Sequence, residues 1–485
     1  MNQLTESGIS PESEKLTLKT KLAFGAGDMG AGMTANLVVF SFLVFLTNVA
    51  GLSPRLAGTV LLIGKIWDGF NDPLIGFLSD RTRSRWGRRH SWMLYGSIPF
   101  GISFALMWVV PDFGGSTTAK FWYYVVVSII FFTTYTSVNL PYAALTAELT
   151  QDYDERTNLS SFRLAFSLAG AVLGLALGFI FAANIPNLET QHFFLGVTCA
   201  VLSVLPLYWC IWGTRGRLQY NAERKAQQSL NSGDRHQDAL PIRTQLKIVF
   251  SNRPFLFVIG IYLLSWLALQ ITAAIIPYFV INWMGLDSYF SVALIVQGCA
   301  IPMLFICSAI SQRVGKRGIY FIGMSFWIIV QAGLVFLQPD QVGLMYVLAF
   351  AASFGVATAY VVPWSMLPDV IELDELHTGQ RREGAFYSFM TLLQKMGLAI
   401  GIFLVGYALE FSGFVSRTPG QPIPEQPESA LLAIRLAIGP LPTLCLILGL
   451  VLVYFYPLTR EIHDDILLKL RQQQQSPPQD DLPSN

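Results

Sequence analysis

Charged side chains inside a strongly apolar stretch are the residues of this sequence whose types and spacing best suit chemistry. Residues 56–79 contain Lys65, Asp68, Asn71 and Asp72. On a helix, Asp68 and Asp72 share one face one turn apart, and the other two adjoin them. Two carboxylates this close in a poorly solvated bundle must share a proton, hold a cation or meet a basic side chain. We therefore predict a functional site here, the alternative being a static ion-pair cluster that pins helices together.

The elements that position these charges are predicted to be membrane-spanning helices. Of the 485 residues, 53% are hydrophobic and only 13% are charged, about half the charged fraction of soluble domains. The apolar residues form blocks of about twenty, the length that a helix needs to cross the hydrocarbon core of a bilayer. The predicted spans lie at 22–50, 56–79, 92–110, 120–146, 159–183, 193–213, 254–283, 290–311, 318–338, 343–367, 385–410 and 430–457. We expect an all-α, multi-pass protein of the cell membrane with twelve transmembrane helices.

The placement of basic residues predicts the orientation. With both termini on one side, 25 of the 32 Lys and Arg fall in segments on that side, four fall on the other side and three lie within spans. Basic loops tend to stay in the cytoplasm, so both termini are predicted to be cytoplasmic. The predicted organisation is a cytoplasmic tail (1–21), a six-helix bundle (22–213), a solvated linker (214–253), a second six-helix bundle (254–457) and a partly disordered cytoplasmic tail (458–485).

Other chemistry-bearing residues form no recognisable cofactor or enzyme site. Gly25, Gly27 and Gly30 match a dinucleotide fingerprint, but no strand precedes them. The five His residues lack the spacing of metal ligands, and the five Cys residues all lie in apolar spans, where they pack as small hydrophobes. We expect no enzyme activity, no cofactor and no metal beyond a monovalent coupling cation.

The two halves repeat one another. Pro141 to Leu145 closes span four and is followed by an acidic loop, and Pro363 to Leu367 closes span ten in the same way. The basic loop from Asp80 to Arg89 is echoed after span eight by Gly315 to Arg317. Spans five and eleven both carry glycines at four-residue spacing, which allows close helix approach. Two similar six-helix halves that rock about a central site are typical of the major facilitator fold.

Three strings carry a resemblance to a known family. KIWDGFNDPLIGFLSDRTRSRWGRR, TYTSVNLPYAALTAELTQDYDERTNLSSFR and LPDVIELDELHTGQRREGAFYSFMTLLQKMG resemble the glycoside-pentoside-hexuronide:cation symporters, over nearly the whole chain. The resemblance implies that Na⁺ or H⁺ is bound by Asp68, Asn71, Asp72 and Thr136. It also matches Lys395 and Arg163 to the family's basic residues in spans eleven and five.

The sugar-binding pattern of that family is altered in this chain. Gly32 replaces an Asp of span one, and Asn139 and Ala143 replace an Asp and a Trp of span four. The strings WVVPDF and LPDV also resemble the related lysophosphatidylcholine symporter branch. A glycoside-like solute and a lysolipid or other amphiphile therefore both stay open as substrates. A sensor on the same fold that does not transport is a further alternative, although the appended signalling domain expected of it is missing.

Further residues are predicted to couple, gate and bind substrate. Lys395 is expected to neutralise the span-two acids when the cation is absent. Lys65, which lies three residues before Asp68, is also assigned to coupling. The loop containing Asp80, Arg81, Arg88 and Arg89 is predicted to be a conformational latch that pairs with acids such as Glu148 or Asp152, the alternative being simple topogenic charge.

The predicted substrate site consists of Arg163, Asn139, Tyr142 and Asp28, with Trp364 as an aromatic wall; alternatively, Asp28 and Arg163 form only a structural salt bridge. The expected partners are a small solute, a monovalent cation and the lipid bilayer, without nucleic acid, and the protein is expected to be a monomer.

Overall fold

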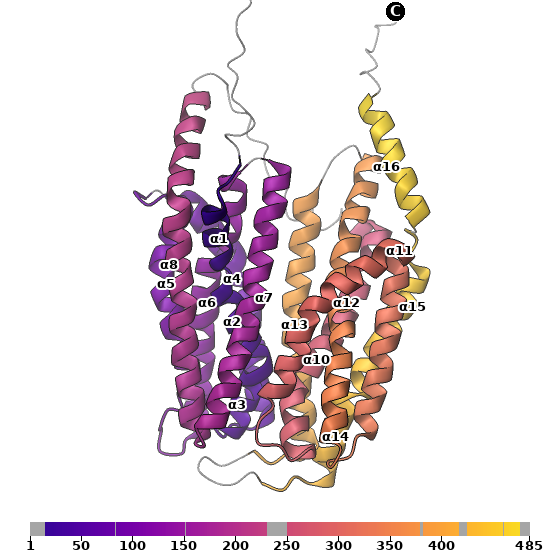
Figure 1. Cartoon of the computed structure of the whole chain (residues 1–485). Helices are drawn as coiled ribbons and strands as arrows, with labels where there is room; N and C mark the ends of the chain where they lie inside the picture. Colours follow the sequence, from indigo (N-terminus) through magenta and orange to yellow (C-terminus); the bar gives the residue numbers. More distant parts are fainter. Residues whose placement is uncertain are drawn as a thin grey trace, which may run out of the picture. The chain divides into compact units, whose positions relative to one another are not determined.

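The computed structural model describes residues 15–82, 84–150, 152–229, 250–378, 382–416, 424–458 and 460–475, and every regular element within these ranges is helical (Figure 1). Nine helical segments of this part of the chain are long and apolar enough to cross a membrane. The apolar blocks of the sequence thus form helices, as predicted, because a helix satisfies its backbone hydrogen bonds internally.

The first predicted span is an interrupted helix. It consists of α1 (Leu18–Ala26), α2 (Met29–Leu37), a π-helical turn η2 (Val38–Phe42) and α3 (Leu43–Asn48). The break falls at Gly27 and Asp28, so that Asp28 stands at the start of α2 without capping it. Broken helices and π turns are common where a membrane protein builds a polar site.

The remaining helices of the first half are longer and continuous. They are α4 (Pro54–Arg81), α5 (Arg88–Met107), α6 (Thr117–Leu149), α7 (Tyr153–Asn184) and α8 (Leu188–Ser229). α8 continues beyond its predicted end at residue 213, so the first part of the predicted linker is helical, whereas residues 230–249 lie outside the described ranges.

The second half is built in the same manner. It contains α10 (Arg253–Tyr278), the π turn η3 (Phe279–Trp283), α11 (Phe290–Phe336), α12 (Val342–Thr378), α13 (Glu383–Phe411), α14 (Glu428–Ile438), α15 (Pro440–Phe455) and α16 (Arg460–Gln475). α11 holds two predicted spans that meet at Gly315, whose φ of 76° is non-helical. α16 extends through Gln475, where an irregular tail was expected, because Gln and Arg are good helix formers.

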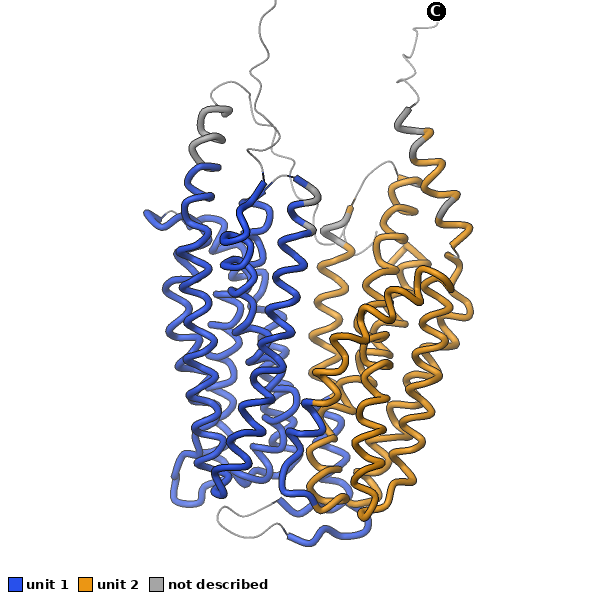
Figure 2. The backbone as a smooth tube through the Cα atoms, in the orientation of Figure 1, with its two compact units in different colours: residues 1–237, 286–294, 402–430 blue, residues 238–285, 295–401, 431–485 orange. Residues whose placement is uncertain are grey.

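The chain forms two compact units (Figure 2). Unit 1 consists of residues 1–237, 286–294 and 402–430, and unit 2 of residues 238–285, 295–401 and 431–485. Each unit has its own core of large buried aromatic side chains, such as Trp108 and Tyr142 in the first and Trp327 and Tyr320 in the second. Helices α4, α6, α2 and α7, which carry most of the predicted site residues, all belong to unit 1.

Close packing of α2 on α7 depends on glycine. A Cβ at Gly170 of α7 would come within 2.1 Å of the backbone oxygen of Met29, so no other residue fits without moving one helix. The prediction that the span-five glycines permit close helix approach is confirmed at this position.

Candidate functional site

Oxygen atoms from α4 and α6 converge at the carboxylates singled out in the sequence. The hydroxyl of Thr136 on α6 lies 3.0 Å from Oδ1 of Asp68 and 3.2 Å from Oδ1 of Asp72. A hydroxyl has a single proton, so Thr136 donates to one carboxylate at a time. Three oxygen atoms thus lie close together between α4 and α6, and oxygen ligands are those that hard cations prefer.

The cluster is buried and combines two carboxylates with one ammonium. Asp68 is fully buried and Asp72 is half-buried. The ammonium of Lys65 lies 3.5 Å from Oδ2 of Asp68 and 4.2 Å from the centre of the Phe132 ring. Two adjacent carboxylates in a poorly solvated bundle are suited to share a proton or to hold a monovalent cation.

The backbone around these side chains is adapted to the site. Asn71 is buried, and its amide donates to the carbonyl of Phe132 on α6 at 3.5 Å, which leaves its side-chain oxygen as an acceptor. Pro73 lies inside α4 directly after Asp72. Proline has no N–H group, so the carbonyl of Gly69, one turn earlier, loses its helical hydrogen bond within the turn that separates the carboxylates.

A second polar group links α2, α6 and α7. Nε of Arg163 donates to Oδ2 of Asp28 at 3.1 Å, and the guanidinium lies 5.4 Å from the centre of the Tyr142 ring. The hydroxyl of the fully buried Tyr142 donates to the carbonyl of Phe24 at 2.7 Å. Asn139 donates its amide to the carbonyl of Tyr135 at 3.0 Å. The structure therefore brings together Asp28, Arg163 and Tyr142, with part of their hydrogen-bonding capacity used internally, and Asn139 lies three residues before Tyr142 on α6.

Position 32 of the first span, where the family that the sequence resembles has an Asp, leaves no room for a side chain. A Cβ at Gly32 would lie 2.1 Å from the backbone oxygen of Ser167 on α7. An Asp side chain at this position would push α2 and α7 apart. The region presents the Asp28–Arg163 pair, one turn earlier along the broken helix.

The basic loop after α4 is engaged with acids at the ends of its neighbours. Arg88 pairs with Glu148 at 2.6 Å, and Arg89 contacts Asp80 and lies 3.4 Å from the same Glu148 oxygen. Arg81 instead stacks on the Phe77 ring. Asp152, offered as another acid for these arginines, caps α7 by accepting from the amide of Glu155 at 2.8 Å.

The second half contains a related cluster that sequence spacing did not reveal. Lys316, directly after the positive-φ Gly315, donates to Asp369 of α12 at 2.6 and 2.8 Å. Gly87, which precedes Arg88, also has positive φ, so the loop repeat extends to backbone conformation and to ion pairing. His463 of α16 lies 2.7 Å from Glu372 and 3.3 Å from the same Asp369.

These three groups from α12 and α16 have ligand atoms within 4.8 Å of one another. Spacing along the chain cannot show such a cluster, because its histidine and its acids are about ninety residues apart. The feature of the sequence that pointed to this region of the second half was the repeat of the basic loop, which contains Lys316.

A buried histidine connects α5 to α8 beside the first basic loop. Nε2 of His90 lies 2.9 Å from the Thr214 hydroxyl, and burial lowers the pKa of His90 to about 4. The imidazole is therefore neutral at physiological pH, and it is held by a hydrogen bond instead of an ion pair.

Two predicted site residues belong to unit 2. Lys395 is half-buried in α13. Trp364 of α12 lies in an aromatic cluster, with ring centres 5.8 Å from Tyr262 and 6.1 Å from Tyr387. Their roles in coupling and substrate binding stay predictions.

Comparison with known proteins identifies the family. Residues 23–460 match the model of a family described as MFS/sugar transport protein. The chain belongs to this family. It is a multi-pass membrane transporter and not an enzyme, and the resemblance in its sequence motifs is confirmed.

Relatives over the full length are named as symporters. An uncharacterized symporter of Synechocystis sp. is 48% identical, over 96% of this chain and 99% of that protein. A protein of Escherichia coli (strain K12), provisionally named a glycoside/cation symporter, is 29% identical over 84% and 86% of the two chains. The sodium-dependent lysophosphatidylcholine symporter 1 of Xenopus tropicalis is 27% identical over 95% and 92%.

The fold is also that of solved transporters. The inward-open xylose transporter XylE from E. coli superimposes with a TM-score of 0.60 at 14% identity, covering 92% of this chain and 98% of that one. This likeness supports the major facilitator architecture of the chain, and it carries no information about substrate.

Proposed function

We propose that this protein is a secondary active transporter that couples the inward movement of Na⁺ or H⁺ to a small solute by alternating access. The architecture proposed with it is twelve transmembrane helices in two six-helix halves, 22–213 and 254–457, with both termini cytoplasmic. The names of the full-length relatives, which include glycoside/cation and sodium-dependent symporters, support this proposal.

The observation that carries the proposal is the buried oxygen cluster between α4 and α6. The Thr136 hydroxyl contacts both carboxylates, so oxygen atoms from two helices meet in one buried place. A hard monovalent cation prefers such oxygen ligands. A static ion pair between Lys65 and Asp68 would require neither the second carboxylate nor the hydroxyl.

Besides the cation site, the proposed transport cycle involves Lys395 and the charged loop after α4. In the empty protein, the Lys395 ammonium takes the place of the cation near the span-two acids, so that less charge crosses the low-dielectric barrier. The contacts of Arg88 and Arg89 with Asp80 and Glu148 act as a latch that stabilises one access state.

The proposed substrate site surrounds the Asp28–Arg163 pair, with Asn139 and the Tyr142 ring from α6 and Trp364 from the second half. The guanidinium supplies several donors that fit sugar hydroxyls, a uronate or a phosphate. A glycoside-like solute is the first candidate. A lysolipid is the second, because a lysophosphatidylcholine symporter is related over the full length and because Gly32 leaves no room for a sugar-binding Asp.

Uptake into proteoliposomes tests the proposal. The purified protein should accumulate one member of a panel of glycosides, uronides and lysolipids when an inward Na⁺ or H⁺ gradient is imposed, and an ionophore that dissipates the gradient should abolish the accumulation. Counterflow without any gradient dependence would instead indicate a facilitator. Binding of a panel member without any flux would favour a membrane sensor.

A further inference from the structure

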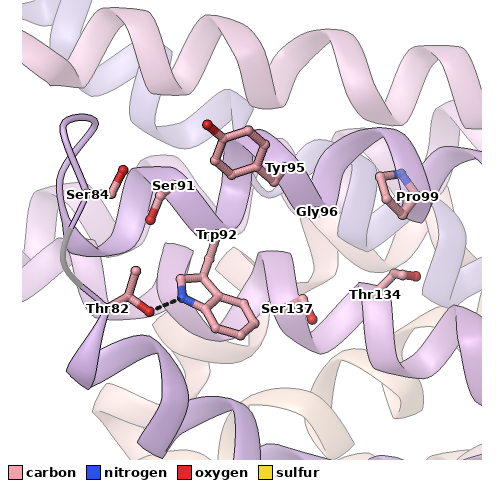
Figure 3. Close-up of a pocket in the computed structure, with 9 residues that line it drawn as sticks. All are labelled: Thr82, Ser84, Ser91, Trp92, Tyr95, Gly96, Pro99, Thr134 and Ser137. Atoms are coloured by element: carbon pink, nitrogen blue, oxygen red, sulfur yellow. Dashed lines mark hydrogen bonds between the residues drawn. The ribbon is translucent and has the colours of Figure 1, made fainter.

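An open groove lies on the surface of the first half, between α5, α6 and the basic loop after α4. It has a volume of about 460 Å³, within the range of 300–1,000 Å³ usual for ligand sites. Figure 3 shows the Trp92 ring between Thr82 of the loop and Ser137 of α6, with Pro99 farther along α5. None of these residues takes part in the cation or substrate sites proposed above.

The groove continues a surface that faces the lipid. Tyr95, Ile98 and Ile102 are exposed at helical spacing along α5, and so are Val126 and Ile130 along α6. A row of exposed apolar side chains on a membrane helix is the face that contacts hydrocarbon. The lining of the groove runs from Ser91 to Pro99, which on a helix is about 12 Å, close to the depth of one leaflet of a ~30 Å hydrocarbon core.

The wall of the groove offers little to a soluble polar ligand. Most of its hydroxyls donate their protons to helix carbonyls, among them Thr82 to Leu78 at 2.8 Å and Ser137 to Thr133 at 2.7 Å. The indole N–H of Trp92 is likewise used, on the Thr82 hydroxyl at 2.7 Å. A sugar placed along Trp92 and Pro99 would leave most of its own acceptors without donors, which is costly, whereas a hydrocarbon chain requires none.

The mouth of the groove is basic. The segment from Asp80 to Arg89 holds five arginines and a single acid. Arg88 and Arg89 contact Glu148, while Arg85 is exposed beside Ser84, which lines the groove. The positive charge of this loop predicts that it is cytoplasmic, where anionic headgroups attract basic residues. Trp92 and Tyr95 lie close to the loop, at the depth where aromatic side chains anchor to the interface.

We propose that this groove binds an anionic phospholipid of the cytoplasmic leaflet. One acyl chain lies along Trp92 and Pro99 between α5 and α6, and the headgroup phosphate lies at Arg85 and Ser84. The proposal is independent of the transported solute, because the groove is separate from the Asp28–Arg163 pair.

Native mass spectrometry of the full-length protein in detergent, with phosphatidylglycerol or phosphatidylcholine added, tests this inference. Ser137→Leu fills the groove and Arg85→Gln removes the headgroup partner. Their controls are Val126→Leu, which adds bulk to the exposed face of α6 outside the groove, and Arg55→Gln, which removes an exposed arginine at the opposite end of α4.

The wild-type protein should retain phosphatidylglycerol in preference to phosphatidylcholine. Arg85→Gln should weaken its retention about fivefold, the effect of roughly one basic residue near a lipid surface. Ser137→Leu should abolish retention, and both controls should behave as wild type. Equal retention of the two lipids, unchanged retention in Ser137→Leu, or an equal loss in the controls would overturn the proposal. Should Ser137→Leu fail to fold, the comparison of Arg85→Gln with Arg55→Gln decides. Because the measurement reads lipid binding alone, a negative result leaves the proposed symport intact.

Discussion

Replacing Asp72 by Asn removes one of the two negative charges that face Thr136. With Asp68 and Lys65 unchanged, the substitution leaves one carboxylate in the cluster, while the volume of the side chain is almost unchanged. Two unit charges 4 Å apart interact by about 4 kcal/mol at an effective dielectric constant of 20. We expect the loss of this attraction to weaken cation binding by about two to three orders of magnitude.

The consequence for transport is measurable as an accumulation ratio. A monovalent cation moving inward gains about 2.3 kcal/mol per 100 mV, enough to concentrate a neutral solute about fiftyfold. In proteoliposomes with a fixed membrane potential, the wild type should therefore approach a ratio of tens, and Asp72→Asn a ratio of about 1. Counterflow exchange, which needs no gradient, should persist in part.

The matched control is Asp112→Asn. Asp112 is an exposed loop carboxylate whose oxygen accepts from the amide of Gly114, a contact that Asn retains. This variant should accumulate solute like the wild type. Full accumulation by Asp72→Asn, and likewise by Asp68→Asn, would refute the assignment of the cation site.

Four further predictions concern other groups. Lys395→Ala should reduce coupled accumulation, and loss of one span-two carboxylate should restore it; normal coupling in Lys395→Ala would rule out its proposed role. Asp80→Lys should change the transport rate with little effect on substrate affinity, because the latch lies away from the substrate, and the opposite pattern would contradict the latch. Transported solute should protect cysteines introduced at Asn139 or Tyr142 from a membrane-permeant thiol reagent, and protection of neither would place the substrate elsewhere. His90 has a folded-state pKa of about 4, below its unfolded value of about 6.5, so its contribution to stability should be constant above pH 6.5 and should be lost as the pH drops towards 4, by about 3 kcal/mol in total; His90→Gln should reduce the loss of stability over this pH range in thermal unfolding.

Several features of the helices could not be read from hydropathy. The first span was predicted as one helix, but it is interrupted at Gly27 and Asp28, and the last span divides at Gly439 before Pro440. Hydropathy averages over about twenty residues, whereas such breaks depend on one or two residues and on the neighbours that satisfy the freed backbone groups. The break places Asp28 opposite Arg163, so it matters directly for the candidate substrate site.

The sequence alone determined the membrane-spanning class, the family and the α4 carboxylates, because apolar block length, local motif strings and one-turn spacing are all local properties. Asp68 and Asp72 had to share a face on any helix. Tertiary structure decided which residues of other helices contact that face and which distant residues pair with one another. Examples are the Thr136 hydroxyl at both carboxylates, the Asp28–Arg163 pair, and His463 beside Asp369 and Glu372. These contacts join residues 64 to 135 positions apart, and they form only when particular helices pack at a particular rotation, which is set by features such as the steric limit at Gly170.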